Sequence, residues 1–340
     1  MNKRLPIIIA EAGVNHNGSL DMALQLVRAA AKAGADYVKF QTFRAESLVG
    51  PDASKAEYQK ANCPDGSDSQ LEMLRGLELT ADDFAVIAAE CRTQSIGFVS
   101  TPFDLESVDI LAPLGMDFWK IPSGEITNLP LLRKIGALGQ NIVLSTGMCT
   151  LQEVEDALVA IEQAGTPRCK VVLLHCTTQY PAPYESVNLR AMDTLAQLGC
   201  GGVGYSDHTE GIAVTVAATA LGAVVIEKHF TLDRSLPGPD HRASLTPPEL
   251  NNMICEIRRV RAALGNGIKE VAEVERTNIA VARKSIVAKR AIKKGELFTA
   301  DNLTAKRPGT GLSPMLWDQL IGQPSPADFP PGALITLLNS

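Results

Sequence analysis

The sequence has few of the features that mark secreted or membrane proteins. Seven of its 340 residues are cysteines, and none forms a Cys-x-x-Cys pair. An odd, scattered set is typical of a reduced chain, so we expect a cytoplasmic protein without a disulfide framework. The first apolar run breaks at Glu11, which is too early for a signal peptide. The most membrane-like run, 212–226, is shorter than a bilayer span, so we expect no membrane partner.

Positive charge is also scarce. The formal net charge is −6, which argues against nucleic acid as a partner. A few lysines in a cleft can still dominate the local field, so an anionic small-molecule substrate fits this composition. Apolar residues make up 45% of the chain and charged residues 21%, as in an ordinary soluble protein. A length of 340 residues suits a barrel-sized domain followed by a small one.

Strand-like apolar runs alternate with helical patterns along most of the chain. Eight runs are present, and they cover residues 6–10, 36–40, 97–100, 117–121, 141–145, 170–175, 202–205 and 224–228. Strict alternation of strand and helix implies a parallel sheet. Eight repeats favour a closed (β/α)8 TIM barrel, with an open doubly wound sheet as the alternative. Thr80-Ala-Asp-Asp has the pattern of a capping box, and the long polar connection 46–76 is typical of a lid or binding loop.

The character of the sequence changes near residue 284. We expect a TIM-barrel catalytic domain at 1–265, a linker at 266–283 and a small mainly-β domain at 284–340. The linker should contain a polar helix over 270–281. Short β-like runs at 285–288, at Phe298 and at 334–338 are separated by Pro and Gly turns. A module of this size lacks a strong core of its own, so we expect it to dock on another surface.

Polar side chains follow the predicted strands where each strand ends. In a barrel, the active site lies at the C-terminal ends of the strands. His208 and His229 follow the last two strands, and two neighbouring imidazoles form a candidate divalent-metal site, although two hydrogen-bonded structural histidines would give the same pattern. Lysines, hydroxyls and a glycine-rich turn at the other strand ends are parts of a phosphate or carboxylate cradle. His16 and His241, in polar loops, are interpreted as structural, and Cys176 as a packing residue.

Nine short motifs at the strand ends occur in order along the chain. They are Ala-Glu11-Ala-Gly-Val-Asn-His-Asn-Gly, Val-Lys39-Phe-Gln-Thr-Phe, Ser-Thr101-Pro-Phe, Lys120-Ile-Pro-Ser123-Gly-Glu125, Leu-Ser145-Thr-Gly-Met, His-Cys-Thr-Thr-Gln-Tyr180-Pro-Ala-Pro, Tyr-Ser206-Asp-His208-Thr, Ile-Glu227-Lys-His229-Phe and Gly-Pro-Asp240-His-Arg-Ala-Ser. Together they resemble the bacterial sialic acid synthase family. The C-terminal Lys-Arg307-Pro-Gly-Thr-Gly-Leu-Ser is similar to the antifreeze-like (SAF) domain of that family.

This resemblance implies a nonulosonic (sialic) acid synthase, a transferase that condenses phosphoenolpyruvate with an acylamino mannose-type sugar. The products would be a nine-carbon 2-keto acid and phosphate. The acceptor would be N-acetylmannosamine or a 2,4-diacetamido-2,4,6-trideoxymannose of the legionaminic acid pathway. Some members carry Asn where this chain has Thr178, so both sugars stay open. The resemblance further implies a divalent metal, Mn2+ with Mg2+ or Co2+ as alternatives, and a domain-swapped homodimer.

The roles of individual residues also follow from the resemblance. His208 and His229 would hold the metal, and Glu11 and Asp240 would act with them in catalysis at the sugar or the metal-bound water. Phosphoenolpyruvate would be bound by a set of lysines and hydroxyls, namely Lys39, Thr101, Lys120, Ser123, Ser145 and Ser206. The sugar would meet Glu125, Thr178, Tyr180 and Glu227. Arg307 would reach the substrate from the small domain of the partner subunit.

Two other classes of function stay open at this point. The first is a pyruvate aldolase or lyase in which Lys39, Lys120 or Lys228 forms a Schiff base. The second is a carbohydrate- or ice-binding protein, which the C-terminal module alone would favour. The charged strand ends argue against the second class, because a flat binding surface has no need of buried lysines.

Overall fold

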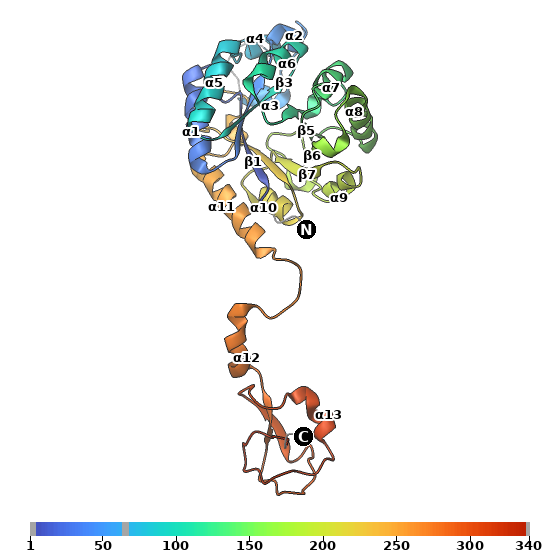
Figure 1. Cartoon of the computed structure of the whole chain (residues 1–340). Helices are drawn as coiled ribbons and strands as arrows, with labels where there is room; N and C mark the ends of the chain where they lie inside the picture. Colours follow the sequence, from blue (N-terminus) through green and yellow to red (C-terminus); the bar gives the residue numbers. More distant parts are fainter. Residues whose placement is uncertain (1–4, 63–67, 338–340) are drawn as a thin grey trace. The chain divides into compact units, whose positions relative to one another are not determined.

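The computed structural model describes residues 5–62 and 68–337, and its first unit is built on eight parallel strands (Figure 1). The strands are β1 Ile7–Gly13, β2 Tyr37–Thr42, β3 Gly97–Pro102, β4 Trp119–Ile121, β5 Ile142–Ser145, β6 Val171–Cys176, β7 Gly202–Asp207 and β8 Val225–His229. Their order is β3-β2-β1-β8-β7-β6-β5-β4, and β3 packs beside β4 to close the ring. The predicted TIM barrel is therefore confirmed, and the open doubly wound sheet is wrong.

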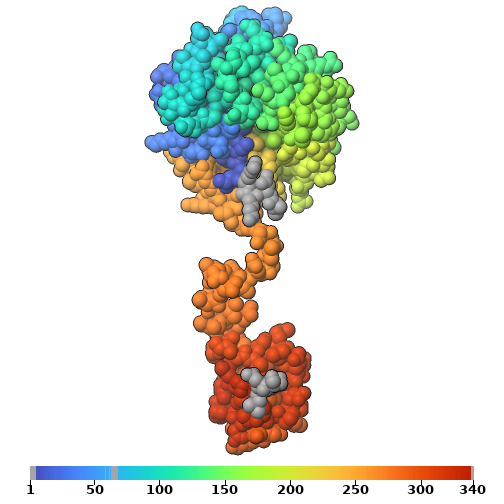
Figure 2. All heavy atoms as spheres, viewed as in Figure 1, coloured from blue at the N-terminus to red at the C-terminus, as the bar shows by residue number. Residues whose placement is uncertain are grey.

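Helices surround the barrel on its outer side, between successive strands (Figure 1). They are α1 Leu20–Ala33, α2 Ala45–Leu48, α3 Glu57–Asn62, α4 Gln70–Arg75, α5 Ala81–Thr93, α6 Leu105–Leu111, α7 Leu129–Gly136, α8 Leu151–Ala164, α9 Ala191–Ala196, α10 Ala213–Ala220 and α11 Pro247–Ala263. The space-filling view shows their side chains packed against one another over the barrel (Figure 2). No helix in the described residues is both long and apolar enough to cross a bilayer.

Local sequence signals set several helix ends. The expected capping box at α5 is present, with Asp83 accepting from the Thr80 hydroxyl at 2.7 Å and Thr80 accepting from the Asp83 N–H at 3.2 Å. Helix α1 ends at Gly34, whose φ of 89° lies in the left-handed region that glycine adopts readily. These caps satisfy backbone groups that have no partner within the helix.

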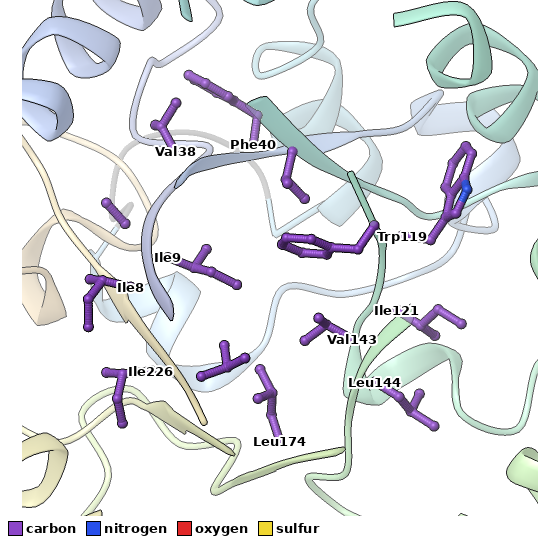
Figure 3. Packing of buried hydrophobic residues seen from close by; sticks show 14 of the residues in the cluster. Ile8, Ile9, Val38, Phe40, Trp119, Ile121, Val143, Leu144, Leu174 and Ile226 are labelled. Carbon is purple, nitrogen blue, oxygen red and sulfur yellow. The ribbon is translucent and has the colours of Figure 1, made fainter. Parts of the chain in front are cut away.

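Apolar side chains fill both the inside of the barrel and the layer between strands and helices. Ile9, Phe40, Leu144 and Leu174 are completely buried and belong to one continuous cluster (Figure 3). Strands of a parallel barrel are covered on both faces, which explains why β1 reads as an almost unbroken apolar run. Side chains at the bottom and middle of the barrel thus form the core, and the C-terminal ends are left for polar groups.

The connection between β2 and α5 differs from the open loop expected over 46–76. It contains three short helices, α2, α3 and α4, while residues 63–67 of the expected lid lie outside the described residues. Asn62, at the end of α3, donates to the carbonyl oxygen of Pro239 at 2.7 Å. This bond ties the connection to the loop that follows β8.

The remaining chain forms a second unit, Gly267–Ser340, separate from Met1–Asn266. It begins with a 3-10 turn at Glu273–Glu275 and helix α12, Arg276–Ala282, so the helix expected over 270–281 starts later than predicted. Ala272 is extended, and Glu275 accepts a hydrogen bond from its N–H at 3.0 Å, which holds the chain out of helix before this point.

A small apolar cluster organises the second unit, in which Ile286, Phe298 and Ile335 are completely buried. Strands β9, Ser285–Ala288, and β10, Leu303–Lys306, form a two-stranded antiparallel sheet, followed by α13, Trp317–Leu320. The run at 285–288 is a strand as expected. The runs at Phe298 and 334–338 are wrong as strands. Within the described residues of the second run, only Leu334 forms an isolated bridge, with Val287, and near Phe298 the bridge is formed by Leu297 with Pro324. Residue 338 lies outside the described residues.

Candidate active site

A cavity of about 640 Å³ opens at the C-terminal ends of the barrel strands. Arg307 belongs to the second unit, whereas all of the predicted site residues that belong to the first unit line this cavity. They are Glu11, Lys39, Thr101, Lys120, Ser123, Glu125, Ser145, Thr178, Tyr180, Ser206, His208, Glu227, His229 and Asp240. A second hollow of about 860 Å³ beside it, lined by His175 and Arg190 among others, contains neither the buried lysines nor the histidine pair.

Lys120 and a ring of hydroxyls form one side of this cavity. Lys120, on β4, is completely enclosed and donates to the hydroxyl of Ser145 at 2.7 Å. Burial lowers the pKa of Lys120 to about 8, although the nearby Glu227 carboxylate opposes that shift. Ser123 lies in a 3-10 turn, and its hydroxyl accepts from the N–H of Gly147 at 2.9 Å. A cation with fixed hydroxyl and N–H groups around it is suited to bind a phosphate or carboxylate.

Lys39 lies between two buried carboxylates at the centre of the floor. Its ammonium is 3.1 Å from Glu227 and 3.4 Å from Glu11. Burial alone would lower the pKa of Lys39, but the two carboxylates raise it, so Lys39 stays charged. Burial raises the pKa of Glu11 to about 8, whereas Lys120 and Lys39 overcome burial and lower the pKa of Glu227 to about 2. One carboxyl is thus held as an acid and the other as an anion.

The strand register explains this arrangement. Glu11 is paired with Lys39 on one side and with His229 on the other, and Ser206 is paired with Glu227. Side chains alternate along a strand, so residues two apart point to the same side. Glu227 and His229 therefore both face the cavity, and Lys228 between them points away from it.

His208 and His229 face each other across this cavity. Their ring centroids are 5.6 Å apart, and the Tyr180 ring lies against both, at 4.2 Å from His208 and 5.7 Å from His229. Burial lowers the pKa of His208 to about 4 and that of His229 well below its usual value, so both rings are neutral at physiological pH. Neutral imidazoles are the form that binds metals.

The donor set fits an open metal site with two protein nitrogens. The Nδ1 atom of His208 lies 2.6 Å from the carbonyl oxygen of Thr177, which makes Nδ1 the donor and leaves the Nε2 lone pair free. The Nδ1 atom of His229 is buried without a hydrogen-bond partner in the described residues, and it lies 4.0 Å from Asp240. No group of three His, Cys, Asp or Glu side chains in the described part of the chain is arranged around a common metal position. Further ligands would have to come from water or substrate.

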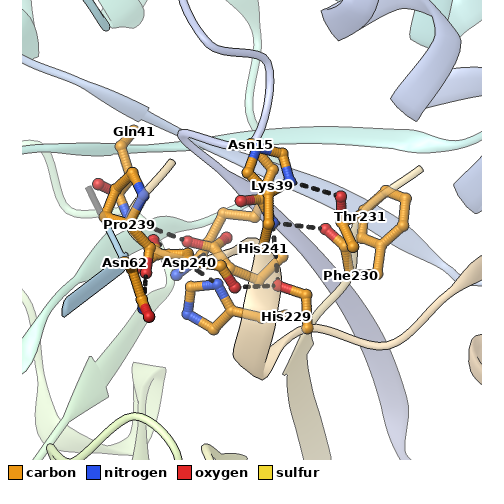
Figure 4. Close-up of polar contacts among 12 residues, drawn as sticks. Asn15, Lys39, Gln41, Asn62, His229, Phe230, Thr231, Pro239, Asp240 and His241 are labelled. Atoms are coloured by element: carbon orange, nitrogen blue, oxygen red, sulfur yellow. Dashed lines mark hydrogen bonds and ion pairs between the residues drawn. The ribbon is translucent and has the colours of Figure 1, made fainter. Parts of the chain in front are cut away.

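Figure 4 shows two residues to which the sequence analysis gave no role, Gln41, which lines the cavity, and Asn62, which contacts Pro239 at its edge. Gln41 follows Lys39 by two residues on β2 and donates to Glu11 at 3.3 Å. The period of two along a strand could have predicted this position. Asn62 comes from the 46–76 connection and approaches Asp240 through Pro239, a contact for which the sequence gives no signal.

Four residues near the strand ends have other predicted roles: His16 and His241 as structural histidines, Cys176 as a packing residue and Lys228 as a Schiff-base candidate of the aldolase alternative. His16 and His241 are buried, and the Nδ1 of His241 lies 2.6 Å from the Thr231 hydroxyl, which agrees with a structural role. Cys176 is buried as well, but it lines the cavity, with its Sγ 3.2 Å from the Ser123 hydroxyl. Lys228 is completely buried, pairs with Asp207 at 2.8 Å and does not line the cavity formed by the described residues.

Comparison with known proteins agrees with this arrangement. The model of the NeuB family matches residues 26–269, and that of the SAF domain matches residues 283–338. The chain belongs to the NeuB family. It is 50% identical to an N,N'-diacetyllegionaminic acid synthase of Campylobacter jejuni, over 97% of this chain and 98% of that protein. It is 48% identical to a protein of the same name in Legionella pneumophila, over 93% of this chain and 89% of the other.

The fold of this NeuB family member also resembles the solved structure of another protein. The N-acetylneuraminic acid (sialic acid) synthetase of Leptospira borgpetersenii, solved in complex with citrate, matches with a TM-score of 0.71 and 33% identity. The match covers 82% of this chain and 91% of that one. The expected relationship to sialic acid synthases with a C-terminal SAF domain is therefore confirmed.

Proposed function

We propose that this protein is a nonulosonic acid synthase, which joins phosphoenolpyruvate to an acylamino mannose-type sugar and releases phosphate. The observation that carries the proposal is that one cavity holds both a pair of buried lysines, Lys39 and Lys120, and the imidazole pair His208 and His229. The lysines suit a small polyanion, and the imidazole pair suits a carbonyl that must be polarised. The names of the curated relatives, which are legionaminic acid synthases, agree with this chemistry.

Phosphoenolpyruvate carries a carboxylate and a phosphate, and the cavity floor offers a match for each. The ammonium groups of Lys39 and Lys120 supply charge, and the hydroxyls of Ser123 and Ser145 supply directed hydrogen bonds. The Thr101 hydroxyl is buried and lacks a hydrogen-bond partner among the described residues. A buried polar group in this state costs free energy until a ligand satisfies it.

The reaction forms one carbon–carbon bond and one carbon–oxygen bond from water, and it breaks the carbon–oxygen bond to phosphate. The vinyl carbon C3 of phosphoenolpyruvate attacks the aldehyde carbon of the open-chain sugar, and the aldehyde oxygen takes up a proton. Water then adds to C2 of the former phosphoenolpyruvate and loses one proton. The resulting C2 hydroxyl loses the second proton and becomes the keto group as the bond between C2 and the phosphate oxygen breaks. The products are a 2-keto acid and inorganic phosphate.

Side chains at the cavity floor are placed for the proton and charge changes of these steps. Glu11, a buried acid whose pKa is raised to about 8, can donate a proton to the developing alkoxide. Glu227, held as an anion beside Lys39, can stabilise positive charge that develops at C2. Asp240, whose pKa burial raises to about 6, lies next to His229 and can exchange a proton near the sugar.

A divalent metal, Mn2+ with Mg2+ or Co2+ as alternatives, is part of this proposal. His208 and His229 would hold it, and a bound ion would act as a Lewis acid that polarises the sugar aldehyde. The orientation of His208 by Thr177 and the unsatisfied Nδ1 of His229 support a metal at this position. The arrangement of the two subunits as a domain-swapped dimer, with Arg307 acting in the partner's cavity, is likewise proposed.

A phosphate-release assay tests the proposed function directly. The purified chain is incubated with phosphoenolpyruvate, Mn2+ and either N-acetylmannosamine or 2,4-diacetamido-2,4,6-trideoxymannose. We expect phosphate release that depends on one of the sugars, with a 2-keto acid of the combined carbon skeleton detected by mass spectrometry. Phosphate release that is independent of both sugars would contradict the proposal.

A further inference from the structure

The main cavity has two chemically different sides. Its floor consists of the charged strand ends described above. One of its walls consists of apolar side chains from the β2–α5 connection and the end of β3, and we define this apolar wall as Phe43, Leu48, Val49, Met73, Leu74 and Phe103. All six residues belong to one apolar cluster that is separate from the barrel core.

The apolar wall is held in place by its own packing. Phe43 and Leu74 are buried, and the Phe43 and Phe103 rings meet edge to face at 6.4 Å. The connection is also held near its middle, where Asn62 donates to the carbonyl oxygen of Pro239 at 2.7 Å. A wall that is formed before a ligand arrives can discriminate between ligands without the cost of ordering it.

Such a wall offers no favourable contact to phosphoenolpyruvate, because phosphoenolpyruvate is a three-carbon unit that bears two anionic groups. Its partners are the lysines and hydroxyls of the floor. The wall therefore faces the other substrate, the acylamino sugar. The assignment of the wall to the acylamino sugar rests on the proposed function.

The two candidate acceptors differ at the positions that an apolar wall can distinguish. N-acetylmannosamine carries hydroxyls at C4 and C6. In 2,4-diacetamido-2,4,6-trideoxymannose the C4 hydroxyl is replaced by an acetamido group and the C6 hydroxyl by hydrogen, so that C6 is a methyl group. A hydroxyl placed against apolar side chains loses its hydrogen bonds to water, whereas a methyl group gains from burial there.

The polar groups next to the wall are side-chain amides. Gln59, in α3, lines the same cavity, and its Oε1 accepts a hydrogen bond from the N–H of Ala56 at 2.9 Å. This bond orients the amide and leaves its NH2 group as the donor. Such a donor suits the carbonyl oxygen of an acetamido group.

From these contacts we propose that the apolar wall selects the acceptor, and that it favours a 6-deoxy-4-acetamido mannose-type sugar over N-acetylmannosamine. The half-buried Leu48 and Met73 are the side chains through which the wall meets the sugar. They act on specificity and take no part in binding phosphoenolpyruvate.

The test compares the two acceptors in wild type and in wall variants. We expect the wild type to have a kcat/KM for 2,4-diacetamido-2,4,6-trideoxymannose at least about tenfold above that for N-acetylmannosamine. Leu48→Gln and Met73→Gln introduce an amide of similar size, and each should reduce that ratio about tenfold, mainly through KM for the diacetamido sugar. The Kd of phosphoenolpyruvate, measured by calorimetry without sugar, should not change.

A matched control and a conservative variant make the result specific. Leu138→Gln places the same change at an exposed leucine that precedes β5, at the opposite end of the barrel, and should leave the ratio unaltered. Leu48→Met keeps the wall apolar and should keep the preference. Thermal melting of each variant reports whether it is folded.

The outcomes separate this inference from the proposed function. If both sugars release phosphate but the wall variants leave the ratio unchanged, or if wild type prefers N-acetylmannosamine, the wall does not select the acceptor and the synthase function stands. If neither sugar supports phosphate release, the proposed function fails, and the inference fails with it. A ratio that falls in the wall variants but not in Leu138→Gln supports both.

Discussion

The imidazole rings of His208 and His229 lie 5.6 Å apart, centroid to centroid, although 21 positions separate them in the sequence. They meet because both stand at the C-terminal ends of adjacent parallel strands, β7 and β8, and both face inward. The pair is neutral and enclosed, and one ring is oriented by a backbone carbonyl. These are the properties expected of two ligands of a divalent metal.

Replacing either ring should remove the metal and the activity. We expect His208→Ala and His229→Ala each to lower kcat/KM by at least about 100-fold, and to abolish Mn2+ binding measured by electron paramagnetic resonance. His175→Ala is a suitable control, since His175 is a half-buried histidine of β6 outside the cavity whose Nε2 contacts the carbonyl oxygen of Val187. Full activity of the wild type in the presence of a strong chelator would end the metal hypothesis.

Binding of phosphoenolpyruvate should weaken at alkaline pH. The pKa of Lys120 is lowered to about 8, chiefly by burial, so the ammonium group that an anion needs is lost above that pH. Calorimetry should therefore show Kd rising about tenfold per pH unit beyond pH 8. Glu11 loses a proton over the same range, since burial raises its pKa to about 8.

The variant Glu11→Gln separates the two groups. In this background the alkaline loss of affinity should persist, because Lys120 still titrates. In the double variant Glu11→Gln/Lys120→Met, binding should be weak at every pH and should show no such slope. A flat profile for Glu11→Gln alone between pH 8 and 9.5 would assign the effect to Glu11 instead.

Sequence patterns were sufficient for the architecture and for most of the floor of the cavity. Apolar runs separated by helical patterns predict a barrel, and a barrel brings every strand end to one mouth, so Lys39 and Lys120 could be placed together. The predicted strands were too short where polar residues follow apolar ones. Glu11 and Thr101 still lie in β1 and β3, because the ladder continues as long as the backbone is paired, whatever the side chain.

The parts that could not be predicted are those made by long-range contacts of loops. Asn62 and Pro239 are 177 positions apart and meet only through the folding of the β2–α5 connection over the cavity. The apolar residues Leu48 and Met73 read as ordinary loop and helix positions, since short helices have no clear period. In the second unit the strand at 303–306 was not predicted, because a strand of four residues has no clear sequence period.

The buried pair Asp207–Lys228 should behave as a structural element of the two strands that carry the histidines. Both side chains are inaccessible to solvent and lie 2.8 Å apart, directly behind the inward-facing Ser206 and Glu227. Removing one partner leaves a buried charge, so Lys228→Met should lower the free energy of unfolding by about 3–5 kcal/mol in urea titrations. The double variant Asp207→Leu/Lys228→Met should recover most of that loss.

Lys228 also bears on the aldolase alternative. A Schiff-base lysine must reach the carbonyl of its substrate, and Lys228 points away from the cavity. Treatment with pyruvate and borohydride should therefore produce no covalent adduct on Lys228, and the proposed synthase reaction, which needs no Schiff base, predicts none on Lys39 or Lys120. A pyruvyl adduct detected by mass spectrometry on Lys39 or Lys120 would favour the aldolase, and one on Lys228 would contradict the buried pair as well.

Arg307 is the one predicted site residue that belongs to the second unit. It is exposed in the second unit, where its Nε donates to the carbonyl oxygen of Ala282 at 3.0 Å. If it completes the cavity of a partner subunit, Arg307→Ala should lose activity while the melting temperature stays near that of the wild type. Lys306→Ala, which removes the neighbouring exposed charge, serves as the control.

Mixing two inactive variants tests the exchange between subunits. Arg307→Ala has an intact barrel, and Lys120→Met has an intact small domain. After the two are co-refolded in equal amounts, half of the dimers should contain one copy of each, and one of their two cavities should be complete, so about a quarter of the wild-type activity should return. If Arg307 instead served its own barrel, each mixed dimer would contain two defective cavities, and no activity would return.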